Sequence, residues 1–224
     1  MNTCQKRNSL VLLLSAMLLL IFTLTACGEE KILPPARYGE EVGSVLLANE
    51  YTFDEAKEAA DYIAQLKIGN WVSENLTTNE TMFEAEVVKV YKSPDGKELP
   101  DDIIFIQLAS SKRIFANIPL MTYGNEIFVF LSDADYSGVD NAYYSIGAFS
   151  TVLYVVNDSS GETYAVDRFT MLGPTTDIAN YAVDDVKCDD IIACAIKSDD
   201  VFSKIITPYC YIFNFDDLCT ELFG

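Results

Sequence analysis

The N-terminal part of the chain contains one continuous apolar run, whereas apolar and polar residues are mixed in the remainder. The run covers 15 residues, 10–24, and reads LVLLLSAMLLLIFTL. It is shorter than the ~20 residues that a membrane-spanning helix needs. Lys6 and Arg7 precede it, and the first acidic residue is Glu29. A basic start followed by a short apolar run is typical of a secretory signal peptide, which we assign to residues 1–26.

The pattern after residue 51 predicts a helix and then a strand. Thr52 and Glu55 are spaced as a capping box, and four apolar residues follow at helical spacing: Phe53, Ala56, Ala59 and Ala60. From Tyr62 to Ile68 apolar and polar residues alternate, which predicts a strand. A helix that continues to Ile68 is the alternative that this stretch leaves open.

Further runs rich in β-branched and aromatic residues predict additional short strands, with Gly, Pro, Asn and Asp between them as turn residues. These runs are residues 82–91, 103–108, 127–131, 143–149, 152–156 and 163–166. Six or seven short strands separated by such turns predict a small barrel or sandwich. We therefore expect a mainly β (α+β) fold with an N-terminal helix and a C-terminal, mostly helical appendage.

The composition changes after Pro174. Residues 177–224 carry ten acidic and three basic residues, and Ser198 followed by two aspartates predicts the start of a helix. The expected organisation is a signal peptide at 1–26, a tether at 27–51, a β domain at 52–173 and an acidic, Cys-containing region at 174–224.

The end of the apolar run resembles the lipobox of bacterial lipoproteins. It reads Leu24-Thr25-Ala26-Cys27-Gly28, with a branched apolar, a hydroxyl and a small residue before the cysteine. The resemblance implies that Cys27 receives a diacylglyceryl group and becomes the first residue of the mature chain. Buried acyl chains such as palmitate contribute about 0.8 kcal/mol per methylene to anchoring. An uncleaved anchor with a chance cysteine is the alternative.

The same resemblance implies a location at the cell membrane, lipid-anchored on the extracytoplasmic face. Gly28 at the second mature position favours the outer membrane of a Gram-negative envelope, or the outer face of the plasma membrane in a Gram-positive cell, and the sequence leaves both open. Residues 28–48 contain Pro34-Pro35 and no clear periodicity, which is typical of a tether.

A second resemblance covers residues 58–156. The stretches FEAEVVKVYK, IPLMTYGNEIFVFLS and YYSIGAFS resemble a group of poorly characterised extracytoplasmic lipoproteins related to OB-fold barrels of the netrin/TIMP type. The most specific piece, residues 123–131, is a tight turn that leads into an apolar strand. The resemblance implies a barrel and no activity, because inhibition by TIMPs needs a free N-terminal cysteine whereas Cys27 is expected to be lipidated.

The charge of the chain narrows the classes of function. It contains 15 basic and 34 acidic residues, a net charge of −19, and no histidine. A polyanion does not seek phosphate backbones, so we expect no nucleic-acid partner. Without histidine, neither a Ser-His-Asp or Cys-His arrangement nor a His-ligated zinc site exists. Loss of Lys6 and Arg7 with the signal peptide leaves a mature net charge of 13 − 34 = −21.

Four cysteines remain in the C-terminal region: Cys188, Cys194, Cys210 and Cys219. An even number outside the cytoplasm predicts two disulfides, with three connectivities open. Their spacing matches no paired metal knuckle and contains no Cys-x-x-Cys redox motif. Buried thiols that form no disulfide are the alternative.

One loop partly matches a calcium-binding pattern. Oxygen-bearing side chains stand at the first, third, fifth and ninth positions: Asp133, Asp135, Ser137 and Asn141. Gly138 stands where the loop turns sharply, but the twelfth position is Tyr144 instead of a bidentate glutamate. Because the flanks are also predicted strands, a solvated acidic hairpin is favoured over a calcium site, and no other cofactor is expected.

The remaining features favour binding over catalysis. The 13 tyrosines offer stacking platforms for sugars, although most of them fall in strand runs where packing explains them. Adjacent aspartates in a strand point to opposite faces and do not form an acid–base pair. The expected function is a membrane-anchored, non-enzymatic binding or interaction module whose protein or small-molecule ligand the sequence does not identify. An extracytoplasmic hydrolase whose carboxylates meet only in the folded chain is the alternative.

Overall fold

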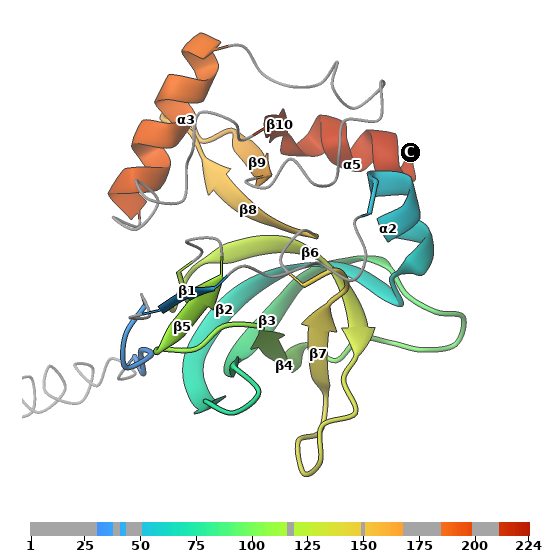
Figure 1. The fold of residues 1–224 in the computed structure, drawn as a ribbon. Helices are drawn as coiled ribbons and strands as arrows, with labels where there is room; N and C mark the ends of the chain where they lie inside the picture. Colours follow the sequence, from blue (N-terminus) through green and yellow to red (C-terminus); the bar gives the residue numbers. More distant parts are fainter. Residues whose placement is uncertain are drawn as a thin grey trace, which may run out of the picture. The chain divides into compact units, whose positions relative to one another are not determined.

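The structure, a computed structural model, describes residues 31–37, 41–43, 51–115, 119–148, 151–167, 185–198 and 211–224. Apart from Lys31, these residues belong to a compact unit that runs from Ile32 to Gly224. They form three helices and ten strands (Figure 1). The helices are α2 (Phe53–Ala59), α3 (Asp185–Ser198) and α5 (Phe215–Phe223). The strands are β1 (Glu41–Gly43), β2 (Tyr62–Asn75), β3 (Glu80–Lys92), β4 (Asp102–Gln107), β5 (Arg113–Phe115), β6 (Glu126–Asp133), β7 (Ala142–Ser145), β8 (Val152–Asn157), β9 (Thr163–Asp167) and β10 (Tyr211–Asn214).

Both ends of α2 are fixed by side chains. Thr52 is the N-cap, and its backbone N–H donates to Glu55 Oε2 at 2.9 Å while the Thr52 hydroxyl accepts from the Glu55 N–H at 3.3 Å. The Thr52 N–H and the Thr52 hydroxyl both donate to the Glu55 carboxylate, and these two hydrogen bonds hold the pKa of Glu55 below its usual value. At the other end, Lys92 Nζ of β3 donates to the carbonyls of Lys57, Glu58 and Ala60. The predicted capping box is confirmed, and a cation from another element completes the C-terminus.

The chain leaves α2 and enters β2, so the alternative of a helix continued to Ile68 is wrong. β2 pairs antiparallel with β3 over most of its length, and the register shifts between Ile68 and Trp71. Gly69 lies in this irregularity, where an added Cβ would approach Cβ and the carbonyl oxygen of Glu84 to 3.2 Å. The absence of a side chain lets the two strands stay close while the ladder bends.

Five strands close into a barrel. Their order is β2-β3-β4-β7-β6, and antiparallel pairing of β6 with β2 completes the ring. β4 and β7 run parallel, with Phe105 opposite Tyr143, whereas the other barrel pairs are antiparallel. The predicted mainly β fold is therefore confirmed as a small barrel. Such a barrel is what the resemblance to OB-fold proteins implied, while a relationship to netrin- or TIMP-type proteins stays a prediction.

Alternate residues of β6 lie in two separate hydrophobic cores. Ile127, Val129 and Leu131 belong to the larger core, which fills the barrel, whereas Phe128 and Phe130 belong to a second core on the opposite face. All five side chains are fully buried. The apolar run that predicted this strand is continuous because both of its faces are covered.

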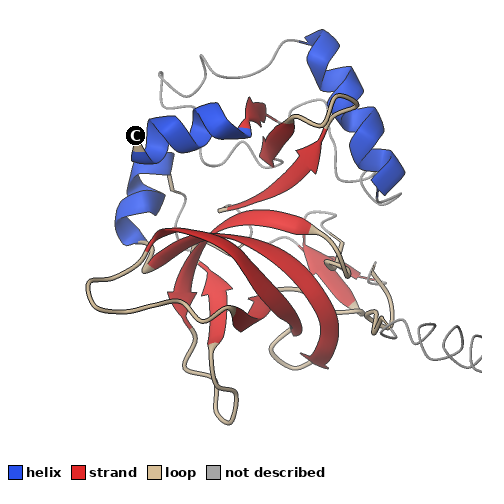
Figure 2. Cartoon of the chain, turned by 180° about the vertical axis from the view of Figure 1, so that it is seen from behind, coloured by secondary structure: helices blue, strands red, loops and turns tan. Residues whose placement is uncertain are grey.

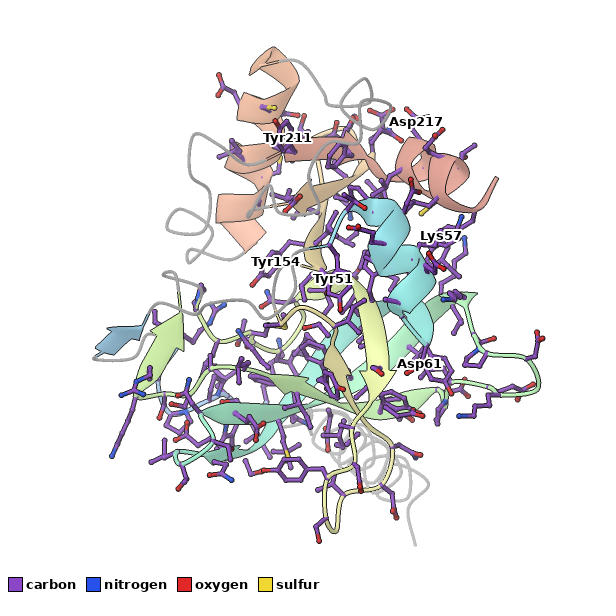
Figure 3. The ribbon with its side chains drawn as sticks, turned by 45° about the vertical axis from the view of Figure 1, so that its right-hand side comes forward. Tyr51, Lys57, Asp61, Tyr154, Tyr211 and Asp217 are labelled. Carbon is purple, nitrogen blue, oxygen red and sulfur yellow. The ribbon has the colours of Figure 1, made fainter. Side chains whose placement is uncertain are left out.

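The second core is closed by elements from both ends of the chain. Phe53 and Ala56 of α2 contribute to it, as do Phe213 of β10 and Phe215 and Leu218 of α5. Lys57 of α2 contacts the C-terminal end of α5 (Figure 3). Its Nζ donates to the carbonyl of Leu222 and lies 5.3 Å from the centroid of the Phe223 ring, so this cation caps the end of α5.

The C-terminal region continues the sheet as well as packing on it. β8 pairs with β6, β9 with β8, and β10 with β9, which extends the barrel sheet to eight strands (Figure 2). Ile191 and Ala195 of α3 pack on the larger core, and Asp190 accepts from the Ser159 hydroxyl in the β8–β9 turn at 2.9 Å. The predicted helical character is confirmed, and the region forms one compact unit with the barrel.

The expected tether needs correction, and the helix expected from Ser198 is described only in part. Residues 32–37, expected to belong to a tether, are hydrogen-bonded to the barrel, and β1 pairs in parallel with β5. Residues 1–30, 38–40 and 44–50 lie outside the described part of the chain. Ser198, expected to start a helix, is the last residue of α3, and the residues that would follow it in the expected helix lie outside the described part of the chain. Residues 28–48 were expected to be a tether because their sequence shows no periodicity. A short edge strand such as β1 needs only backbone pairing and therefore leaves no periodic pattern.

Replacing Lys92 with methionine should destabilise the protein. Methionine keeps much of the apolar stem but leaves three carbonyls at the end of α2 without their cation. We expect a loss of ~1–2 kcal/mol in the free energy of unfolding, measured by urea denaturation. Lys67→Met, on the exposed side of β2, is the matched control and should change stability little. Equal stability of the two variants would contradict the capping role of Lys92.

Candidate functional site

A pocket of about 380 Å³ opens at one end of the barrel. It lies where the start of β3, the end of β4, the β6–β7 hairpin and the chain after β7 meet, so its walls come from four separated segments. Its lining residues are Glu80, Ile106, Leu108, Ala134, Asp135, Tyr136, Tyr144, Ser145, Gly147 and Ala148. This volume is within the range of ~300–1,000 Å³ that small-molecule sites usually have.

Hydrogen bonds link the two loops that flank the pocket. Asn75 Nδ2, at the end of β2, donates to the Tyr136 hydroxyl at 3.4 Å. Asn75 Oδ1 accepts from the backbone N–H of Thr77 at 2.9 Å, and the Thr78 hydroxyl donates to Glu80 Oε2 at 2.5 Å. Asn75 thus organises the β2–β3 turn and also contacts the β6–β7 hairpin.

The chemistry of the pocket is aromatic and acidic. Tyr136 and Tyr144 supply two rings, and the ring-bearing side chain of Tyr144 is 44% exposed. Glu80 and Asp135 supply carboxylates, while no lysine or arginine is among the lining residues. Such a site accepts hydrogen bonds from hydroxyl or amino groups and offers ring faces for stacking. It does not favour anionic ligands, because nothing in its lining neutralises their charge.

The four residues of the calcium-loop candidate lie in the hairpin between β6 and β7. Asp133 is exposed and pairs with Lys97 at 3.7 Å, Asp135 lines the pocket, and Asn141 has a positive φ of 55°. Ser137 lies at the exposed tip. Within the described ranges, no three acidic or cysteine side chains are grouped as metal ligands. The structure therefore brings Asp135 into the candidate site and directs Asp133 toward a lysine.

The predicted disulfides meet a geometric restriction. None of Cys188, Cys194 and Cys219 is bridged to another of the three, while Cys27 and Cys210 lie outside the described residues. Cys188 and Cys194 are six residues apart on α3, hence ~9 Å along its axis, which exceeds the ~7 Å Cα limit for a disulfide. A bridge between these two is incompatible with the helix. Each of the other two connectivities joins Cys219 to Cys188 or Cys194, a bond that this structure does not contain, so the two disulfides stay a prediction.

Cys219 is held in the second core beside an aromatic ring. Burial raises the pKa of its thiol despite a hydrogen bond with Tyr91 that acts the other way. Burial, followed by the contact with Cys219, also raises the pKa of Tyr91. A thiol with a raised pKa is mostly protonated at neutral pH and is a poor nucleophile. Cys219 therefore has a packing role in this structure.

Sequence reasoning singled out Asp135 but missed Glu80, Tyr136 and Tyr144. Tyr144 was noted only because it replaces the glutamate that a calcium loop requires. Its position beside the pocket depends on β7, which places Tyr144 opposite Ile106 of β4 and Ser132 of β6. Since these partners are distant along the chain, only the closed barrel reveals the group.

Comparisons with protein-family models, with curated proteins and with solved structures find no match to this chain. Among the helices that the structure describes, none is long and apolar enough to span a membrane.

Divalent cations should stabilise the protein only by screening its negative charge. Asp133 already has a lysine partner, and the twelfth loop position lacks a carboxylate, so we expect calcium and magnesium to raise Tm equally. Asp133→Asn should respond to both ions as Asp140→Asn does, since each loses one exposed charge of the same hairpin. A calcium-selective increase that persists in high salt and disappears in Asp133→Asn alone would instead establish a metal site.

Proposed function

We propose that the protein is a lipid-anchored, extracytoplasmic binding module whose barrel pocket takes an oligosaccharide. The observation that carries this proposal is the convergence of Tyr136 and Tyr144 with Glu80 and Asp135 around one pocket. Sugars present both an apolar ring face and several donor groups, and this pocket offers partners for each. The ligands favoured are neutral or amino sugars.

The extracytoplasmic location is supported by the N-terminal sequence. A basic start, a 15-residue apolar run and the lipobox-like Leu24–Gly28 segment together favour cleavage before Cys27 and its lipidation. A net charge of −19 disfavours nucleic acids, the other ligand class that barrels of this kind commonly bind. Oligosaccharides of the cell surface are available where the anchor would hold the protein.

The position of the pocket gives further support by analogy. In five-strand barrels of the OB type, the loops between strands one and two and between strands four and five border the ligand site. Here the corresponding loops are the β2–β3 turn and the β6–β7 hairpin, and Asn75 joins them through the Tyr136 hydroxyl.

A hydrolase is the second candidate, because Glu80 and Asp135 line the same pocket. Glycoside hydrolysis uses two carboxyl groups across the scissile bond, and one of them is protonated in an apolar environment. Asp135 is exposed, and Glu80 is partly exposed and accepts a hydrogen bond from the Thr78 hydroxyl. Neither environment excludes water, so the arrangement favours binding over cleavage.

Replacing Cys27 with alanine should abolish lipidation at residue 27. Without its thiol the chain cannot accept the diacylglyceryl group, so the variant should be released or accumulate as an uncleaved precursor. Fractionation and intact-mass measurement distinguish these products from the lipidated wild type. Cys4→Ala is the control, because Cys4 lies within the predicted signal peptide. Normal processing and membrane attachment of Cys27→Ala would rule out the lipid anchor.

The pocket is tested with a tetramer of N-acetylglucosamine and the matching tetramer of glucosamine, using isothermal titration calorimetry. We expect both to bind and the positively charged glucosamine tetramer to bind more tightly. Tyr144→Ala should weaken both about tenfold, or ~1.4 kcal/mol. Asp135→Asn should mainly weaken the glucosamine tetramer.

Asp140→Asn is the matched control, because it removes a charge from the same hairpin outside the pocket. If neither tetramer binds, or if Asp140→Asn weakens binding as much as Asp135→Asn does, the saccharide pocket is wrong. Release of shorter sugars by the wild type, lost in Glu80→Gln, would favour the hydrolase.

A further inference from the structure

Three exposed apolar side chains lie close to the point where the N-terminal chain reaches the barrel. Ile32 and Leu33 are 51% and 54% exposed, and Val72 of β2 is 44% exposed. We call Ile32, Leu33 and Val72 the anchor-side surface. Each is too exposed to contribute fully to a core, so the three leave apolar area exposed to water near the point where the chain enters the barrel.

Backbone pairing fixes the position of this surface. The Trp71 N–H donates to the Ile32 carbonyl at 2.8 Å, and the Ile32 N–H donates to Asn70 Oδ1 at 3.0 Å. Asn70 Nδ2 in turn donates to Glu84 Oε2 of β3 at 3.0 Å. Ile32 is therefore held beside Trp71 and Val72.

A second pair of bonds fixes the same segment further along. The Leu120 N–H donates to the Arg37 carbonyl, and Arg37 Nε donates to the Leu120 carbonyl, each at 2.9 Å. Pro34 between the two attachment points is buried. The segment from Ile32 to Arg37 is thus part of the barrel wall, and Leu33 projects from a fixed backbone.

The length of chain before Ile32 limits how far the barrel can stand from a lipid on Cys27. Ile32 is the fifth residue after Cys27, and an extended chain spans at most ~3.6 Å per residue, hence ~18 Å. A compact unit of 193 residues, Ile32–Gly224, has a radius of gyration of ~16 Å and a diameter more than twice that. The side of the barrel opposite Ile32 therefore cannot reach the bilayer surface, whereas the side that carries Ile32 is held close to it.

Basic and acidic residues both lie near the incoming segment. Lys112 and Arg113 are exposed, and Arg113 lies in β5 opposite Glu41 of β1. Figures 1 and 2 place β1 and β5 at the same end of the barrel as the incoming segment. Lys112 and Arg113 are attracted to anionic headgroups, whereas Glu41, Glu29 and Glu30 are repelled by them, so the proposal rests on the apolar side chains and not on charge.

We propose that Ile32, Leu33 and Val72 contact the bilayer that holds the lipid of Cys27, and so fix how the barrel is oriented on the membrane. The proposal rests on the lipid anchor proposed above. Acyl chains bring the surface to the membrane, and contact of the three apolar side chains with the interfacial region replaces their contact with water. The barrel then has one preferred side toward the lipid.

Trp71 provides a built-in probe, because it is the single tryptophan of the chain and its backbone is bonded to Ile32. Lipidated protein, purified from membranes, is placed on phosphatidylcholine–phosphatidylglycerol vesicles with or without lipids that carry a nitroxide on the headgroup. We expect the nitroxide lipids to quench Trp71 emission. The double variant Ile32→Glu/Leu33→Glu should float with the vesicles equally well but lose this quenching.

Val88→Glu/Val90→Glu is the matched control, since these two valines are also exposed and Val90 lies opposite Ala64, near the start of β2. It should retain the quenching. Val72→Glu serves as an independent variant should the double variant unfold, as judged by its Tm, and it too should lose the quenching.

The outcomes separate this proposal from the anchor on which it rests. Wild-type protein that floats with vesicles but shows no quenching overturns the orientation and leaves the lipid anchor standing. Protein that does not float overturns both. If Ile32→Glu/Leu33→Glu and Val72→Glu both retain the quenching, another surface contacts the bilayer and the proposal is overturned. Sedimentation of Cys27→Ala tests a last alternative. If Cys27→Ala forms a dimer, and adding Ile32→Glu/Leu33→Glu to it dissociates that dimer, the anchor-side surface binds a second copy of the chain instead of the bilayer.

Discussion

Burial of β6 on both faces is the constraint on which the rest of the structure depends. A strand with apolar side chains in both directions needs a covering layer on each side. The closed barrel covers Ile127, Val129 and Leu131, whereas α2, β10 and α5 cover Phe128 and Phe130. Elements from the two ends of the compact unit must therefore meet over one strand. This is why β10 and α5 belong to the same compact unit as the barrel.

Most of the fold could be predicted because the strands of the barrel carry strong local patterns. The run at 127–131 and the alternation at 62–68 each became a strand. β1, β5 and β10 were missed, since strands of three or four residues carry no measurable periodicity and form only when a partner edge is present. The parallel pairing of β4 with β7 was likewise invisible, because it depends on closure and not on any neighbouring turn.

The candidate site shows a similar division between local and long-range information. Asp135 was found because a short motif contains it, but the motif suggested a metal. The structure pairs Asp133 with Lys97 and places Asp135 with Tyr136 and Tyr144, and this grouping suggests a ligand with donor groups and ring faces instead. Glu80 joins the group from the start of β3. A motif read along the chain identified one lining residue of the pocket. The other lining residues are brought beside it by sheet register, which a local motif does not contain.

The docking of residues 32–37 has a mechanical consequence. A pull on the N-terminal chain does not act first on a slack linker, because Ile32 is bonded to Trp71 and Asn70, and Arg37 is bonded to Leu120. The load enters the barrel wall through several hydrogen bonds at two separate points. If the chain is held by lipid at Cys27, a force on any bound partner is carried by β2 and β3, the most extensively paired strands. The barrel then moves little relative to its point of attachment.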